Sequence, residues 1–207
     1  TKMNFISSLH QWNLDFKILS ADKLKQNECV ASLLKSVTPI NLLQQLTKST
    51  NNLELTSILL KVIRSTFSTE AGQTAWTSSL DILPLLVNGC YSDSIETADT
   101  CAKLLESSLT NRDNPHLLTF NTTLLDNVVG LLISTNLDVS SCANNILTHT
   151  CTRLSDAKQQ QILVSSVAQL WTNLKDHQES ETTTNTTAAY RALDILARIS
   201  QESTSYF

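Results

Sequence analysis

The stretch at residues 94–109, SIETADTCAKLLESSL, decides the fold. Ala98, Ala102 and Leu105 lie in it at i, i+4 and i+7, which places them on one face of an α-helix. Three other segments carry matching positions, at successive intervals of 43, 45 and 46 residues: Leu55, Leu59 and Val62; Ala143, Leu147 and Thr150; and Ala189, Leu193 and Leu196. A unit repeated at this period cannot bury its apolar face alone, so the sequence predicts helical repeats that stack on one another.

The composition supports an all-α fold and excludes several classes of partner. Three glycines and three prolines among 207 residues are too few for a protein of many short strands and tight turns. The net charge is −4 and only 16% of the residues are charged, so the basic surface that nucleic acids require is missing and we expect no nucleic-acid partner. No apolar run approaches the roughly 18–20 residues that a membrane helix needs, and we expect no membrane span.

Five cysteines form an odd set without paired spacing, which favours a reducing compartment, the cytoplasm or the nucleus. Cys142, His149 and Cys151, with His116 nearby, could be read as zinc ligands. They lack the ligand-pair spacing of zinc sites, so we expect independent core and surface roles, no metal and no cofactor.

The sequence also lacks catalytic motifs. It contains no Gly-x-Ser-x-Gly elbow and no glycine-rich phosphate loop, and its four histidines are scattered along the chain. We therefore expect a protein that is not an enzyme.

The helical segments divide into a cap and four repeats. We take Met3 as the natural start, residues 3–37 as an amino-terminal helical cap, and residues 38–207 as the repeat region. The repeats span about residues 38–68, 69–110, 111–154 and 155–200. No distinctly polar closing cap is evident after the last repeat.

Local features predict details within these repeats. Asp138 is the expected N-cap of the long helix of the third repeat, and residues 176–187, which lack apolar side chains, are the expected loop before a last helix at residues 188–200. Trp12 and Trp171 lie at helical spacing with other apolar residues and are expected in the core, whereas Trp76 lies between polar residues and is expected at the surface.

The order of short, medium and long helices resembles that of armadillo and HEAT repeats. The similarity is most specific at Ile82-Leu83-Pro84-Leu85-Leu86, followed by Asp93 and by the spacing of Ala98, Ala102 and Leu105. The next unit repeats the pattern with Val128, Val129, Leu131 and Leu132, then Asp138, Val139, Ala143 and Leu147. The resemblance implies a right-handed α-solenoid that binds other proteins.

A second resemblance concerns the first half of the chain. Residues 31–41 (ASLLKSVTPIN), the following Leu42-Leu43-Gln44-Gln45 and the segment Leu55 to Ile63 are similar to the opening of the proteasome non-ATPase regulatory subunit five family, which includes the yeast base-assembly chaperone. The similarity covers apolar positions from about Val30 to Leu154. It implies an amino-terminal portion of a chaperone that binds the carboxy-terminal domain of a proteasomal ATPase subunit during assembly of the proteasome base.

The side of the long helices opposite the apolar columns is the predicted partner-binding groove. Its residues are Glu54, Ser57, Lys61, Arg64, Thr97, Thr100, Lys103, Asn144 and Arg153. The alternative for each of them is an ordinary solvated helix face.

Two functions therefore stay open. The first is an assembly chaperone that binds a proteasomal ATPase subunit, and the second is a structural scaffold or adaptor subunit of another multiprotein complex. The chaperone would capture its ATPase domain in isolation, whereas the scaffold would co-purify with its complex at fixed stoichiometry.

Overall fold

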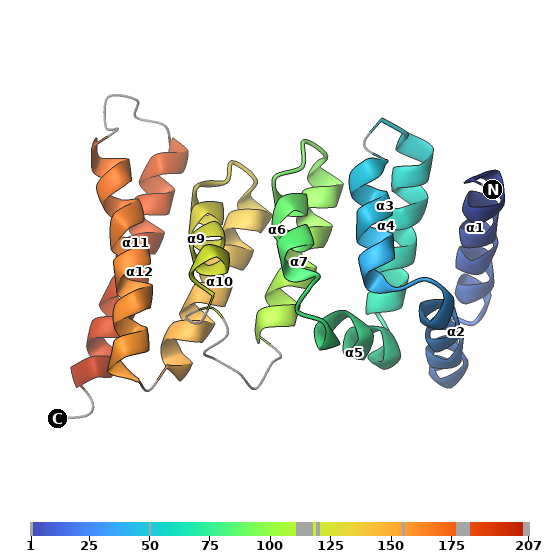
Figure 1. Cartoon of the computed structure of the whole chain (residues 1–207), viewed down its shortest axis with the longest axis horizontal. Helices are drawn as coiled ribbons and strands as arrows, with labels where there is room; N and C mark the ends of the chain where they lie inside the picture. The colour runs from blue at the N-terminus through green and yellow to red at the C-terminus, as the bar shows by residue number, and fades with distance from the viewer. Residues whose placement is uncertain are drawn as a thin grey trace. The chain divides into compact units, whose positions relative to one another are not determined.

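The computed structural model of this chain describes residues 2–49, 51–110, 118, 121–154, 156–176 and 183–204. These residues are helical with short connections and contain no strand, which confirms the all-α class (Figure 1). The chain divides into two compact units, residues 1–89 and 90–207.

The first unit contains six helices among its described residues. They are α1 (Lys2–Ile18), α2 (Lys23–Ser36), α3 (Pro39–Lys48), α4 (Leu53–Phe67), α5 (Glu70–Ser78) and α6 (Leu83–Cys90). Helix α4 packs against α1, α3 and α5, and α2 packs against α5. Thr38 is the N-cap of α3, since its hydroxyl accepts from Asn41 N and Pro39 takes the first helical position.

The second unit is built around α10. Its described elements are α7 (Ile95–Thr110), α9 (Thr122–Gly130), the 3₁₀ turn η1 (Leu131–Ile133), α10 (Leu137–Arg153), α11 (Ala157–Asp176) and α12 (Thr183–Thr204). Helix α10 packs against α7 on one side and α12 on another, and α11 packs against both α9 and α12. In the repeat expected over residues 111–154, residues 111–117, 119 and 120 lie outside the described residues.

Three long helices begin in the same way, at intervals of 42 residues. Asn52 caps α4 by accepting from Leu55 N, Ser94 caps α7 by accepting from Thr97 N, and Asn136 caps α10 by accepting from Asp138 N and Val139 N. The expected cap at Asp138 is therefore wrong by two residues. The 42-residue spacing of the caps gives a better register for the repeat than the apolar columns, whose spacing drifts from 43 to 46 residues.

The same 42-residue register recurs near the other end of these helices. Thr66 of α4, Ser108 of α7 and Thr150 of α10 are all buried, at 0%, 0% and 5% exposure. The hydroxyls of Thr66 and Thr150 donate to backbone carbonyls of their own helices, at 2.8 Å each. A threonine that bonds to its own helix can be buried without leaving an unpaired polar group.

The last helix differs from expectation in its start and in its buried face. Residues 183–187, expected in a loop, form the first turns of α12, while residues 177–182 lie outside the described residues. The expected core position Leu193 is 42% exposed, whereas Ala188, Ala192 and Ile195 are fully buried. The buried face of α12 therefore carries Ala188, Ala192 and Ile195, each one residue before the expected Ala189, Leu193 and Leu196. This face packs against α10 and α11.

Trp76 is fully buried in the first unit, so the expectation that it lies at the surface is wrong. Its indole nitrogen donates to the Thr66 hydroxyl at 3.0 Å, which joins α5 to α4. One turn earlier on α5, Gly72 lies directly over the backbone of Thr66, where a Cβ atom would meet the carbonyl oxygen at 1.7 Å. The missing side chain of Gly72 therefore allows the close approach of the two helices that encloses the indole.

Candidate partner-binding surface

The predicted surface residues of α4 lie on the solvent side of that helix. Glu54, Lys61 and Arg64 are exposed and Ser57 is half-buried. Their spacing of three and four residues places them on one stripe of α4. Nearby, the Ser65 hydroxyl donates to Asn13 of α1 at 3.5 Å, so this stripe borders the packed side of α4.

The two threonines predicted for the surface of α7 are buried instead. Thr97 and Thr100 are 7% and 6% exposed, so the expectation that they face solvent is wrong. The Thr100 hydroxyl donates to the Glu96 carbonyl at 2.7 Å, and the Thr97 hydroxyl lies 3.1 Å from that of Ser94. These local hydrogen bonds allow polar residues to occupy the covered side of a helix.

The 42-residue interval between the helix caps explains the error and identifies the side of α7 that faces solvent. Adding 42 residues to Ser57, Lys61 and Arg64 of α4 gives Asp99, Lys103 and Glu106 of α7. Asp99 and Glu106 are half-buried and Lys103 is exposed, so Lys103 is the predicted residue of α7 that lies at the surface. A further 42 residues give Ser141, Asn145 and Thr148 of α10.

The predicted residues of α10, Asn144 and Arg153, lie beside the row of Ser141, Asn145 and Thr148 and not in it. Asn144 is half-buried, and its side-chain oxygen is buried with no hydrogen-bond partner within the described part of the chain. The neighbouring Asn145 is the exposed amide, and Arg153 is exposed at the end of the helix. The exposed amide of α10 is therefore Asn145, one residue after the predicted Asn144.

Side-chain hydrogen bonds join this stripe across three helices. The Asn136 amide donates to Asp99 at 2.7 Å, the Asn145 amide donates to Glu106 at 3.0 Å, and the Arg191 guanidinium of α12 donates to the Ser141 hydroxyl at 3.3 Å. We name this surface the α7–α10–α12 face and define it by Asp99, Lys103, Glu106, Ser141, Asn145 and Arg191. Of these residues, only Lys103 was in the predicted groove.

The signal for the missed residues was present in the sequence. Asp99, Lys103 and Glu106 are charged residues at i, i+4 and i+7, and the cap residues Ser94 and Asn136 fix their phase relative to α10. The spacing of the apolar residues alone did not show which positions of α7 correspond to which positions of α10. Arg191 could be placed only once α12 was known to begin at Thr183.

The electrostatic character of the face is acidic near the junction of α7 and α10. Asp99, Glu106 and Asp138 lie there, against Lys103 as the nearby cation. Burial is the main cause that raises the pKa of the Cys142 thiol to about 12, while the nearby Glu106 and Asp138 carboxylates also raise it and Lys103 lowers it. The face therefore offers both carboxylates and the exposed Lys103 ammonium to a polar partner.

The described residues contain no group of three or more histidine, cysteine, aspartate or glutamate side chains that could hold a metal ion. The Cys142, Cys151 and His149 side chains have separate surroundings, since both cysteines are buried and His149 is half-buried. Burial lowers the pKa of His149, and the nearby Arg153 lowers it further. None of the helices that the structure describes is both long enough and apolar enough to cross a bilayer.

The cysteines are expected to react slowly with thiol reagents in the folded protein. Burial is the main cause that raises the pKa of Cys101 and Cys142 to about 12, and it also raises the pKa of Cys90, so these thiols are largely protonated and weakly nucleophilic at pH 8. Cys29 is half-buried, and its pKa is raised by burial to a smaller extent. In a titration with Ellman's reagent at pH 8, Cys29 should react first, and all five cysteines should react at once in guanidinium chloride. Rapid native labelling of Cys101 would contradict its placement in the core.

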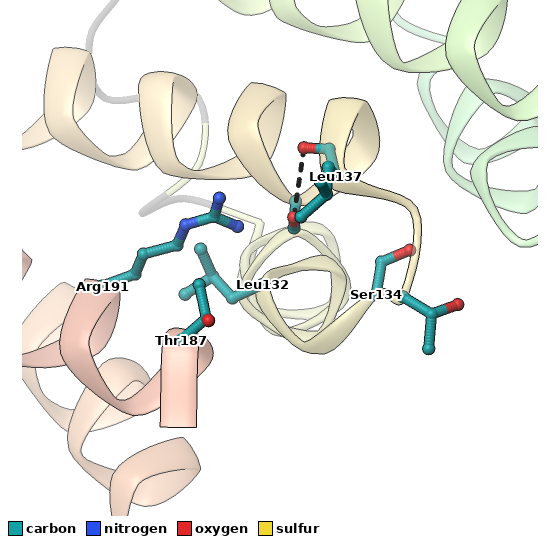
Figure 2. A pocket seen from close by; sticks show the side chains of 7 residues that line it. Leu132, Ser134, Leu137, Thr187 and Arg191 are labelled. Carbon is teal, nitrogen blue, oxygen red and sulfur yellow. Dashed lines mark hydrogen bonds between the residues drawn. The ribbon is translucent and has the colours of Figure 1, made fainter. Parts of the chain in front are cut away.

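A pocket lies beside the α7–α10–α12 face, where α12 meets the turn before α10 (Figure 2). Its volume is about 240 Å³. The lining residues are Leu132, Ser134, Thr135, Leu137, Ser140, Thr187 and Arg191. The pocket thus combines apolar walls, several hydroxyls and one guanidinium.

Comparison with known proteins adds no identification: no protein-family model matches the sequence, and no curated protein matches it either.

Proposed function

We propose that this chain is a non-enzymatic, protein-binding α-solenoid of armadillo/HEAT-like repeats that acts in the cytoplasm or nucleus. The observation that carries the proposal is the α7–α10–α12 face, where polar side chains of three helices are held in place by hydrogen bonds between the helices. Such side chains lose little rotamer freedom when a partner binds, and this lowers the entropic cost of association.

The repeat register supports the solenoid part of this proposal. Caps at Asn52, Ser94 and Asn136 begin three long helices at equal sequence intervals, and each helix buries a hydroxyl residue at the same later position. Equal units of this kind are the building blocks of helical solenoids. Within the second unit, the equivalent positions on α7 and α10 lie on long helices that pack against each other.

The partner that we propose is the carboxy-terminal domain of a proteasomal ATPase subunit, with the chain acting as an assembly chaperone of the proteasome base. The support is the resemblance of residues 31–63 to the non-ATPase regulatory subunit five family, together with the all-helical fold. A chaperone of this kind needs a surface for reversible binding and no catalytic group.

Charge reversal at the surface tests this proposal. In pull-downs with purified carboxy-terminal domains of the proteasomal ATPases, one domain should be retained, and the triple variant Lys61→Glu, Arg64→Glu and Lys103→Glu should weaken its binding by about tenfold or more. All three side chains are exposed, so the fold should persist in the variant, as circular dichroism can check.

A control reverses two exposed lysines elsewhere on the two units. Lys35→Glu on α2 and Lys158→Glu on α11 change the net charge in the same direction and should leave binding within about twofold. If no ATPase domain is retained, and the protein instead co-purifies from cells with another complex at fixed stoichiometry, the chaperone assignment is wrong and the scaffold function takes its place.

A further inference from the structure

We infer that the pocket between α12 and the turn before α10 binds the free carboxylate at the end of a peptide chain whose last residue is apolar. This inference concerns the second unit alone and does not depend on the identity of the partner proposed above. It rests on the charge of Arg191, the surroundings of its guanidinium and the apolar walls of the pocket.

Arg191 provides the positive charge. Among the described residues, its guanidinium makes one hydrogen bond, to the Ser141 hydroxyl at 3.3 Å, and no carboxylate of these residues lies within ion-pairing distance of it. A guanidinium carries five N–H donors in a fixed planar fork, so most of them stay available to an anion. By contrast, Arg198, two turns later on α12, already pairs with Asp194 at 2.9 Å.

The rest of the pocket has one apolar wall and several hydroxyls. Figure 2 shows Arg191 and Thr187 extending from α12 toward Leu132, with Leu137 and Ser134 on the side of the α10 turn. Leu137 is 70% exposed although it is a large aliphatic residue, and Leu132, which also lines the pocket, is 1% exposed. An apolar side chain of a ligand would cover Leu137 while an anionic group reaches Arg191.

The hydroxyl side of the pocket is held in a fixed conformation. The Ser134 hydroxyl oxygen accepts from Asn136 N at 3.2 Å, and Asn136 in turn bonds to Asp99 and caps α10. The Ser140 hydroxyl, 1% exposed as a residue, donates to the Leu137 carbonyl at 3.2 Å. These bonds fix the turn before a ligand arrives, which limits the entropic cost of binding.

Size and charge decide which anion fits. A volume of about 240 Å³ is below the ~300–1,000 Å³ of typical cofactor and drug sites, and it suits a single terminal residue. One guanidinium balances the single charge of a carboxylate better than the nearly double charge of a phosphate, and apolar walls do not favour a strongly hydrated phosphate. Capture of a chain end by its carboxylate is an established mode of peptide recognition.

Fluorescence anisotropy with a labelled hexapeptide ending in leucine tests the inference on the full chain. The free-acid peptide should bind at least about tenfold more tightly than the same peptide with an amidated end. Arg191→Gln should reduce the affinity for the free acid to that for the amide, and Arg191→Lys should retain part of the difference. Arg198→Gln, on the same helix, should leave both affinities unchanged.

A second variant tests the apolar wall without endangering the fold. Leu137→Ser alters a side chain that is mostly exposed, and it should remove the preference for a peptide ending in leucine over one ending in serine. Equal binding of acid and amide, or an unchanged affinity in Arg191→Gln, would overturn the inference. Binding of inorganic phosphate without binding of the peptide would overturn it too, because the pocket would then be a phosphate site.

Discussion

Trp76→Ala should lower the free energy of unfolding of the first unit by about 4 kcal/mol, as expected for loss of a fully buried tryptophan. The substitution removes the largest side chain of this core and the hydrogen bond from its indole to Thr66. Urea denaturation followed by circular dichroism measures the loss, with the first unit's transition moving to lower urea concentration.

Two milder variants separate the packing of Trp76 from its hydrogen bond. Trp76→Phe keeps an aromatic ring and loses the N–H donor, so it should cost less than the alanine variant. Thr66→Val keeps the shape of the threonine but leaves the buried indole N–H without its acceptor, at a cost of about 1–3 kcal/mol. A loss below about 1 kcal/mol in Trp76→Ala would mean that the indole is not in the core.

Gly72→Ala should destabilise the first unit by about 3 kcal/mol, at the upper end of the cost of overpacking. The new methyl group would meet the carbonyl oxygen of Thr66 at 1.7 Å, and a backbone carbonyl cannot rotate away as a flexible side chain can. Helix α5 must then move away from α4, which loosens the packing of Trp76. Thermal unfolding should show a lower midpoint, and tryptophan fluorescence should show a more polar environment.

Gly130→Ala is the matched control for this substitution. Gly130 also has helical backbone angles, and a Cβ atom there would meet only the Tyr91 hydroxyl, at 3.1 Å. Tyr91 is 58% exposed and can shift, so the gain in helix propensity should leave stability unchanged or slightly higher. Equal effects of the two glycine substitutions would contradict the close contact between Gly72 and Thr66.

The helices were largely predictable because their start signals are local. Thr38-Pro39, Asn52 and Ser94 each mark a helix start by a cap that acts within three residues. The buried faces were less predictable because apolar and small residues border one another. Near Ala98, for example, four further residues are buried: Cys101, Ala102, Leu104 and Leu105. An alignment of the repeats can therefore be wrong by several residues and still place apolar or small residues at every expected core position.

The surface was harder to predict than the core, since burial of serine and threonine depends on hydrogen bonds within the helix. Thr97 and Thr100 are polar in the sequence and covered in the structure, while Asp99 beside them reaches Asn136 of the next long helix. Trp76 required knowledge of a second residue, because only the gap left by Gly72 lets α5 approach α4 closely enough to enclose the indole.

The central claim is that the α7–α10–α12 face holds a protein partner. Site-specific photo-crosslinking in cells tests it most directly, with a photoreactive amino acid in place of Lys103 or Asn145 on this face and in place of the exposed Gln161 of α11 as the control. We expect both face positions to give one discrete cross-linked species with the same partner and the control to give none. Cross-links from Gln161 alone, or none from Lys103 and Asn145, would contradict the claim.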